Sequence, residues 1–253
     1  MTIIHKRVTV LLAALCAILA IVVTVLGFFT FGLYREIKEV ELTDHELYYL
    51  EKCNSYRTQN FNLSKGQIVF VGDSITDLYV LDDHYGDLSL ATYNRGIGGD
   101  TTSGVLERLQ VSVYDIKPSK VVLMIGTNDI NGGSELDEIM DRYEKIVSGI
   151  ISSVPGVELY CMSLIPQNEL IEEYSPIRVE NTIPKIISIN DRIKNLAESK
   201  GAVYIDIFTH LADENNLLIR EFSDDGLHLN TAGLEVWTNL IKPYLSEDRT
   251  ESE

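Results

Sequence analysis

The chain has 253 residues, of which 45% are hydrophobic and 23% are charged, and this is the composition of a globular protein. Its 38 acidic and 21 basic residues give a net charge of −17. That acidic balance excludes a nucleic-acid-binding protein, which needs a basic surface, and it favours a solubilising role for the charge.

The first predicted element is a long apolar segment near the N-terminus. Residues 8–34 carry no charge and are rich in Leu, Val, Ile, Ala and Phe. Because about 20 apolar residues are enough to cross a bilayer, this segment predicts a transmembrane helix. Its apolar run is longer than that of an export signal, and no clear cleavage site follows it. We expect residues 1–7 to form a short tail and residues 8–34 an uncleaved signal anchor, with a buried core helix as the alternative.

Basic residues flank the apolar segment on both sides. Lys6 and Arg7 precede it, and Arg35 and Lys38 follow it, so the positive-inside count is nearly balanced. The free amino terminus and the signal-like order of charge and apolar run favour an N-terminus inside the cell. We therefore expect a single-pass protein of the cell membrane, with its catalytic domain outside the cell.

The rest of the chain divides by composition. Residues 35–65 are polar and acidic, with a helical patch around Glu46 to Lys52, and they predict a stalk or linker. Residues 66–245 are long enough for one domain with one core. Residues 246–253 form a polar tail. Cys53 and Cys161 are one possible pair outside the apolar segment, which is too few cysteines to indicate a disulfide framework.

Within residues 66–245, apolar runs alternate with amphipathic patterns. Parallel strands are buried on both faces, which explains uninterrupted apolar runs. We predict an α/β fold: a flavodoxin-like, three-layer αβα sandwich with a mostly parallel five-stranded sheet, preceded by one N-terminal transmembrane helix. The expected strands are residues 68–71, 91–94, 120–125, 157–162 and 202–206. Thr101 or Thr102 is expected to cap the first helix and Ser134 the second, and two further helices are expected to begin at Ile183 and Thr231.

Gly72, Asp73 and Ser74 end the first expected strand. Open α/β sheets bind ligands at the carboxyl ends of their strands, and the turn would present Ser74 there. A serine in such a turn is commonly a cap or turn residue. It becomes a nucleophile only if the chain also supplies a base, a carboxylate to orient that base, and oxyanion donors.

Two further segments follow expected strands. The segment from Asn94 to Thr102 contains Gly96, Gly98 and Gly99, and glycines let backbone N–H groups approach a ligand closely. It lacks the lysine of a phosphate-binding loop, so a flexible loop is the plainer interpretation. Asn128, after the third strand, could donate its side-chain amide to an oxyanion, or could simply be a turn residue.

Asp225 and His228 lie just before the last expected helix, with Gly226 between them. An Asp three residues before a His can fold back, accept from the imidazole and fix its tautomer for general-base work. A capping aspartate and a surface histidine are the alternatives. Metal ligation by this pair lacks a second His or Cys cluster, so we expect neither a metal nor an organic cofactor.

Taken in order, Gly72-Asp73-Ser74, Gly99-Asp100, Gly126-Thr127-Asn128-Asp129 and Asp225-Gly226-Leu227-His228 resemble the four blocks of the SGNH hydrolases, or GDSL esterases and lipases. The resemblance covers about residues 67–245. The stretch from Asn94 to Thr102 looks most like the branch of platelet-activating-factor acetylhydrolase-like and lysophospholipase-like esterases.

The resemblance implies a role for each matching residue. Ser74 would be the nucleophile, His228 its base and Asp225 the residue that orients His228. The N–H groups of Ser74 and Gly99 and the side chain of Asn128 would form the oxyanion hole.

These roles indicate a membrane-anchored serine ester hydrolase, lipase-like or an acetyl esterase, that acts as a monomer on a small-molecule, lipid or carbohydrate ester. The alternative is an O-acyltransferase or deacetylase on cell-envelope polysaccharide. A catalytically silent binding domain is the third hypothesis, and the complete set of catalytic residue types argues against it.

Overall fold

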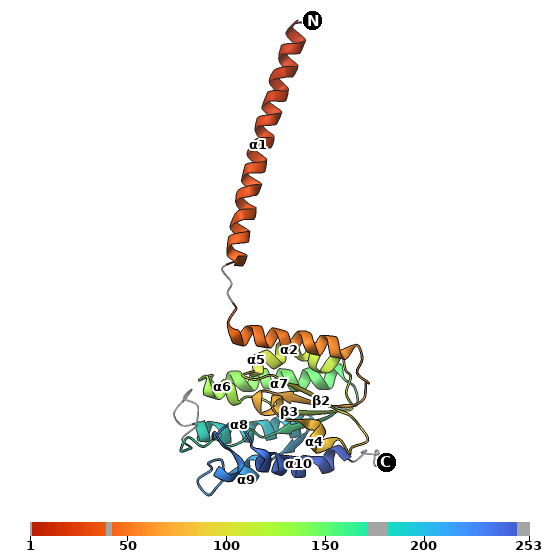
Figure 1. The fold of residues 1–253 in the computed structure, drawn as a ribbon, viewed down its shortest axis with the longest axis vertical. Coiled ribbons are helices and arrows are strands. Elements are labelled where there is room, and N and C mark those ends of the chain that lie inside the picture. Colours follow the sequence, from red (N-terminus) through yellow and green to blue (C-terminus); the bar gives the residue numbers. More distant parts are fainter. Residues whose placement is uncertain (1, 39–41, 172–181, 247–253) are drawn as a thin grey trace. The chain divides into compact units, whose positions relative to one another are not determined.

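The computed structural model describes residues 2–38, 42–171 and 182–246 (Figure 1). The contacts divide the chain into two units, Met1–Leu47 and Tyr48–Glu253. The first unit holds α1 (Thr2–Lys38) and the start of α2 (Asp44–Asn60). The second unit holds the rest of α2 and all the remaining elements.

Helix α1 is apolar along most of its length. Its stretch Arg7–Gly32 has a mean hydropathy of 3.0, and none of its apolar surface is buried inside the structure. By length and composition this helix can cross a membrane, as a signal sequence near an N-terminus can as well. The helix begins at Thr2 and ends at Lys38, so it is longer at both ends than the span expected over residues 8–34.

The second unit is built on one five-stranded sheet whose strand order is β2-β1-β3-β4-β5. Every neighbouring pair is parallel, which confirms the predicted α/β fold, and the order is that of flavodoxin-like sheets. The carboxyl ends of all five strands therefore meet at one edge of the sheet. The strands are β1 (Ile68–Gly72), β2 (Thr92–Gly96), β3 (Lys120–Met124), β4 (Glu158–Met162) and β5 (Val203–Ile205).

Helices cover both faces of the sheet (Figure 1). Neighbouring helices α5 (Thr102–Leu109), α7 (Leu136–Ser153) and α8 (Thr182–Ser199) lie on one face, and α4 (Leu81–Tyr85) and α10 (Thr231–Ser246) lie on the other. The remaining elements are one or two turns long and were not expected. They are α3 (Ser74–Asp77), the π-helical turn Gln110–Tyr114, α6 (Thr127–Asn131), α9 (Phe208–Leu211) and the 3₁₀ turn Arg220–Phe222.

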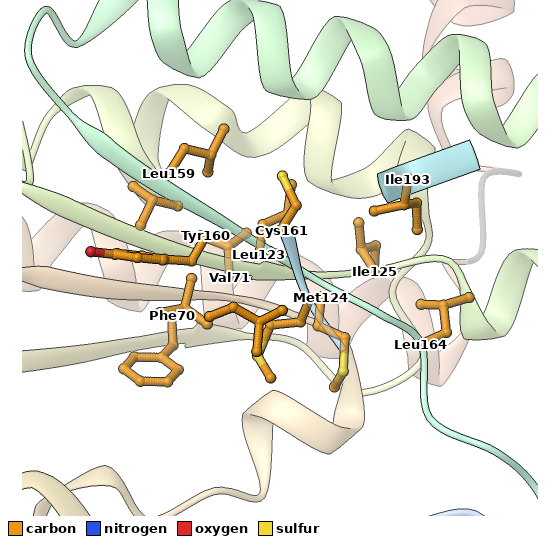
Figure 2. Packing of buried hydrophobic residues seen from close by; sticks show 14 of the residues in the cluster. Phe70, Val71, Leu123, Met124, Ile125, Leu159, Tyr160, Cys161, Leu164 and Ile193 are labelled. Atoms are coloured by element: carbon orange, nitrogen blue, oxygen red, sulfur yellow. The ribbon is translucent and has the colours of Figure 1, made fainter. Parts of the chain in front are cut away.

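The core lies on both faces of the central strands. Phe70, Val122 and Tyr160 share one register position, so they face the same side of the sheet. On that side the Phe70 ring lies 5.2 Å from the Tyr85 ring, and the Tyr160 hydroxyl donates to the Tyr244 carbonyl of α10. Their neighbours in each strand point to the opposite face, and Figure 2 shows Leu159 and Cys161 on the side of the sheet away from Phe70.

Helix α2 differs most from the sequence-based expectation. Residues 35–65 were expected to be a stalk, with the domain beginning at residue 66, but the compact unit begins at Tyr48. Cys53 and Tyr56 of α2 are buried against Ile97. Only a helical patch around Glu46 to Lys52 was expected here, because the buried residues of α2 are one cysteine and one tyrosine among polar residues, and these give no clear apolar stripe.

Three smaller expectations concern the cysteines, the C-terminal tail and the start of α7. All three cysteines are free, and Cys53 and Cys161 lie in separate hydrophobic clusters. The polar tail expected over residues 246–253 falls, apart from Ser246, outside the described residues. No side chain caps α7: its N-cap is Glu135 and not the expected Ser134.

Candidate active site

Ser74 lies at the carboxyl edge of the sheet, directly after β1. Asp73 caps α3 by accepting from the Ile75 N–H at 3.1 Å, which makes half-buried Ser74 the first residue of that helix. The turn requires glycine at position 72, because a Cβ there would lie 2.2 Å from Thr76 Oγ1 and 2.5 Å from the Met124 carbonyl oxygen. Ser74 thus lies where the sequence predicted it, in the turn that follows the first strand.

Buried Asp73 has an unusual environment for a carboxylate. Burial raises its pKa to about 7, and the Ile75 N–H opposes that rise only in part. Its Oδ2 atom has no hydrogen-bond partner within the described part of the chain. Burial thus favours the protonated form of this carboxyl group, immediately before Ser74.

His228 and Asp225 come together with Ser74 across 154 residues of sequence. His228 Nε2 lies 2.9 Å from Ser74 Oγ, and His228 Nδ1 lies 2.6 Å from Asp225 Oδ2. Burial works to raise the pKa of Asp225, but hydrogen bonds from the His228 ring and from the N–H groups of His228 and Leu227 outweigh it and lower the pKa. An ionised Asp225 holds the ring so that Nε2 can accept a proton from Ser74.

The loop that carries Asp225 is held by its own hydrogen bonds. The Ser223 hydroxyl donates to the His228 carbonyl at 2.6 Å and accepts from the Gly226 N–H at 2.8 Å. Asp225 Oδ1 accepts from the N–H groups of Leu227 and His228. The turn is thereby closed before α10 begins, and His228 projects from a fixed backbone.

Gly99 and Asn128 lie at the same edge of the sheet. Gly99 has a φ of +76°, a conformation that favours glycine, in the loop between β2 and α5. Asn128 donates one amide hydrogen to the Asp100 carbonyl at 2.9 Å, so its second amide hydrogen is available for another acceptor. The loop passes close to the serine, because a Cβ built on Gly98 would lie 4.0 Å from Ser74 Cβ.

Arg108, which no sequence motif singles out, holds this edge together. Its guanidinium donates to the Gly72 carbonyl at 2.9 Å, to the Arg95 carbonyl at 2.7 Å and to Asp100 Oδ2 at 2.7 Å. Burial raises the pKa of Asp100, and Arg108 opposes that rise. Removing one partner of such a buried pair leaves an uncompensated charge. Arg108 and Asp100 therefore fix the ends of β1 and β2 against residues 97–101, the glycine loop, as a unit.

A second buried pair orients the helix that carries Asn128. Asp129 accepts from the Thr102 N–H at 2.8 Å and from the Thr102 hydroxyl at 2.6 Å, and Arg142 approaches the same carboxylate at 3.2 Å. This contact fixes α6 at the start of α5. Thr102 was expected only as an alternative helix cap, and Arg142 was not expected to take part because it lies in an ordinary helical pattern.

Within the described residues, no three His, Cys, Asp or Glu side chains are grouped so that they could hold a metal ion. A cavity of about 560 Å³ is lined in part by Asn215, Asn216 and Leu217, which precede the loop that carries His228. Its walls include Gln167, Glu169, Ile183 and Leu217, and none of its lining residues is Ser74, Asp225 or His228. Residues 172–181, part of the loop between β4 and α8, lie outside the described residues.

The chain resembles a family of known hydrolases and several curated proteins. Residues 70–236 match the model of the GDSL-like Lipase/Acylhydrolase family. Over 180 residues, 70% of this chain and 73% of the relative, the chain is 29% identical to the platelet-activating factor acetylhydrolase IB subunit alpha2 of Rattus norvegicus. The same subunit of Homo sapiens is 31% identical over 150 residues, 54% of this chain and 63% of the human protein.

Solved structures match over most of their length. A protein from Streptococcus pneumonia, which its description relates to platelet activating factor, is 32% identical with a TM-score of 0.72, and the match covers 78% of this chain and 92% of that one. A GDSL-like lipase from Bacteroides thetaiotaomicron shares the fold at 24% identity, with a TM-score of 0.68 and coverage of 76% and 96%.

Proposed function

The chain belongs to the GDSL-like Lipase/Acylhydrolase family and is a carboxylic ester hydrolase, and from this premise we propose that it cleaves its substrates through Ser74. The observation that carries the proposal is the continuous contact from Ser74 Oγ to His228 Nε2 at 2.9 Å and from His228 Nδ1 to Asp225 Oδ2 at 2.6 Å. A serine hydroxyl is a weak nucleophile until a base accepts its proton, and this arrangement supplies the base and its orienting carboxylate.

The reaction proceeds in two halves. His228 takes the hydroxyl proton as Ser74 Oγ bonds to the ester carbonyl carbon, and the tetrahedral intermediate then expels the alcohol, which receives that proton from His228. Water next attacks the acyl-serine ester while His228 accepts a proton from it. The acid leaves, the proton returns to Ser74, and Asp225 stabilises the imidazolium in both halves.

The negative oxygen of each tetrahedral intermediate needs donors aimed at it. We propose the N–H groups of Ser74 and Gly99 and the free amide hydrogen of Asn128 for this role. Support comes from the positive φ of Gly99, the closeness of its loop to Ser74, and the Asn128 amide, which donates one hydrogen bond among the described residues, to the Asp100 carbonyl.

Replacing Asn128 tests this oxyanion hole. Asn128→Ala is expected to lower kcat by about 10²- to 10³-fold, with a smaller change in KM, because the donor acts mainly in the transition state. Asn131 provides a matched control on the same helix, since its side chain accepts from Gln167 instead. Steady-state kinetics on p-nitrophenyl acetate would show near-normal kcat for Asn131→Ala, and a comparable loss there would contradict the donor role of Asn128.

The substrate is an ester of a small molecule, and we propose an acetyl or other acyl ester of a lipid or carbohydrate. The relatives that carry the name acetylhydrolase support the acetyl group. Comparison of p-nitrophenyl acetate with the palmitate ester tests the acetyl group, and faster turnover of the palmitate ester would contradict acetyl in favour of a longer acyl group. Turnover that requires a polysaccharide acceptor would indicate acyl transfer in place of hydrolysis.

We further propose that α1 anchors the enzyme in the cell membrane with the second unit outside the cell. Its stretch Arg7–Gly32 supports this proposal by length and hydropathy. Deleting residues 1–35 is expected to release a soluble protein with unchanged kcat, because the catalytic residues all lie in the second unit. Fractionation and kinetics measure both effects, and a C-terminal tag on intact cells that resists protease would reverse the proposed orientation.

A further inference from the structure

One face of α2 lies along the glycine loop of the candidate active site. Cys53 and Tyr56 are buried against Ile97, and the Tyr56 hydroxyl donates to the Gly96 carbonyl. The contacting residues recur at helical spacing, so a single side of the helix faces the loop. Cys53 and Tyr56 contact the loop, Tyr48 and Lys52 contact Asp77 of α3, and Tyr49 contacts Gly104 of α5.

Asp77 connects this helix face to the catalytic serine. It lies on α3, the short helix that begins at Ser74. Asp77 Oδ2 accepts from the Tyr48 hydroxyl at 2.5 Å and from the Gly98 N–H at 2.9 Å. Asp77 Oδ1 accepts from Lys52 Nζ at 2.5 Å. The Asp77 carboxylate therefore connects α2, α3 and the glycine loop.

We propose that Tyr48 and Lys52 are positioning residues for ester hydrolysis: they hold the Asp77 carboxylate so that it fixes the Gly98 N–H, and this sets the direction of the next N–H, that of Gly99. The inference rests on the proposed function, in which the Gly99 N–H donates to the oxyanion. By this inference α2, whose sequence is typical of a linker, supports catalysis.

The environment of the cluster suits this purpose. Lys52 and Asp77 side chains are 27% and 10% exposed, so their ion pair is shielded from solvent more than an open surface pair is. Burial and the bond to Asp77 raise the pKa of Tyr48 to about 12, so its hydroxyl stays protonated and donates at neutral pH. With both oxygens of Asp77 engaged, the carboxylate has one orientation, and the acceptor for Gly98 is fixed.

A loop held by fewer contacts would sample other peptide orientations, and oxyanion donors lose effect when they are misplaced. Tyr48→Phe and Lys52→Met are each expected to lower kcat about 5- to 20-fold with KM within about 2-fold of wild type. The double variant should lose little more than the worse single variant, because both act through Asp77. Lys52→Arg is expected to retain most of the wild-type kcat, because arginine can still pair with Asp77.

The chain offers a matched control for each change. Tyr49→Phe removes another tyrosine hydroxyl of α2, one that donates to the Gly104 carbonyl at 2.9 Å and does not reach Asp77. Arg57→Met removes an exposed cation that pairs with Asn54 on the same helix. Both controls should keep kcat within about 2-fold, even where the melting temperature falls as much as it does in the Tyr48 and Lys52 variants.

Hydrogen exchange at the Gly98 amide tests the same proposal without catalysis. Protection of that amide should fall in Tyr48→Phe and Lys52→Met and persist in Tyr49→Phe. Unchanged kcat and exchange in the two test variants would overturn the positioning role, as would equal losses in the Tyr49 control. Equal hydrolysis by the wild type and Ser74→Ala would instead overturn the proposed function. The exchange of the Gly98 amide would still show whether Tyr48 and Lys52 hold the glycine loop.

Discussion

Ser74→Ala and His228→Ala are each expected to lower kcat by about 10⁴- to 10⁶-fold in ester hydrolysis, with the fold retained. The reason is the 2.9 Å contact between Ser74 Oγ and His228 Nε2, through which the nucleophile loses its proton. Without the hydroxyl no acyl-enzyme forms, and without the imidazole the hydroxyl stays protonated. The measurement is kcat on p-nitrophenyl acetate, with circular dichroism to check the fold.

The double variant distinguishes one catalytic unit from two independent contributions. Each single loss disables the same proton transfer, so Ser74→Ala/His228→Ala should be little slower than either single variant. His210→Ala is the control, because that histidine is exposed and lies on α9. Losses that multiply in the double variant, or a similar loss in His210→Ala, would be inconsistent with a shared step.

The second large effect is expected at Asp225. Asp225→Ala should lower kcat by about 10²- to 10⁴-fold, less than the loss of Ser74, because His228 stays in place and loses mainly its orientation and charge support. Part of the loss arises from the loop, since Asp225 Oδ1 also accepts from the N–H groups of Leu227 and His228. The hydrogen bonds that lower the pKa of Asp225 keep it ionised at neutral pH.

Two further variants separate these contributions. Asp225→Asn retains the shape and an acceptor for the loop but removes the charge, so a large loss there identifies the charge beside Nδ1 as the important element. Asp224→Ala changes the neighbouring exposed carboxylate, which interacts with Asn230, and should keep near-normal activity. If Asp225→Asn retained wild-type kcat, Asp225 would serve only as a loop cap.

The parts of this protein that were predictable from sequence are those with local signals. Uninterrupted apolar runs such as Ile68–Val71 and Val121–Ile125 can be satisfied only by a strand covered on both faces, and the sheet contains them. The polar residues that directly follow those runs had to meet at one edge, since all the strands are parallel. Placement of Ser74 and Asn128 at that edge follows from this rule.

The contacts that were not predictable join polar residues far apart in sequence. Arg108 reaches Gly72, and Lys52 reaches Asp77, and no spacing rule connects such pairs. Helix α2 was interpreted as a stalk because it docks through tyrosines, whose polar hydroxyls reduce the apparent apolar stripe while their rings and hydroxyls both make contacts. Packing of this kind becomes visible only when the partner carbonyls are placed in space.

Covalent labelling tests the central claim, that Ser74 is the nucleophile, most directly. An alkyl p-nitrophenyl phosphonate reacts with an activated serine to give a stable adduct, and peptide mass mapping identifies the modified residue. The account predicts one adduct, on Ser74, that forms much more slowly in His228→Ala and does not form in Ser74→Ala. An adduct on another serine, or equal labelling rates in the wild type and His228→Ala, would contradict it.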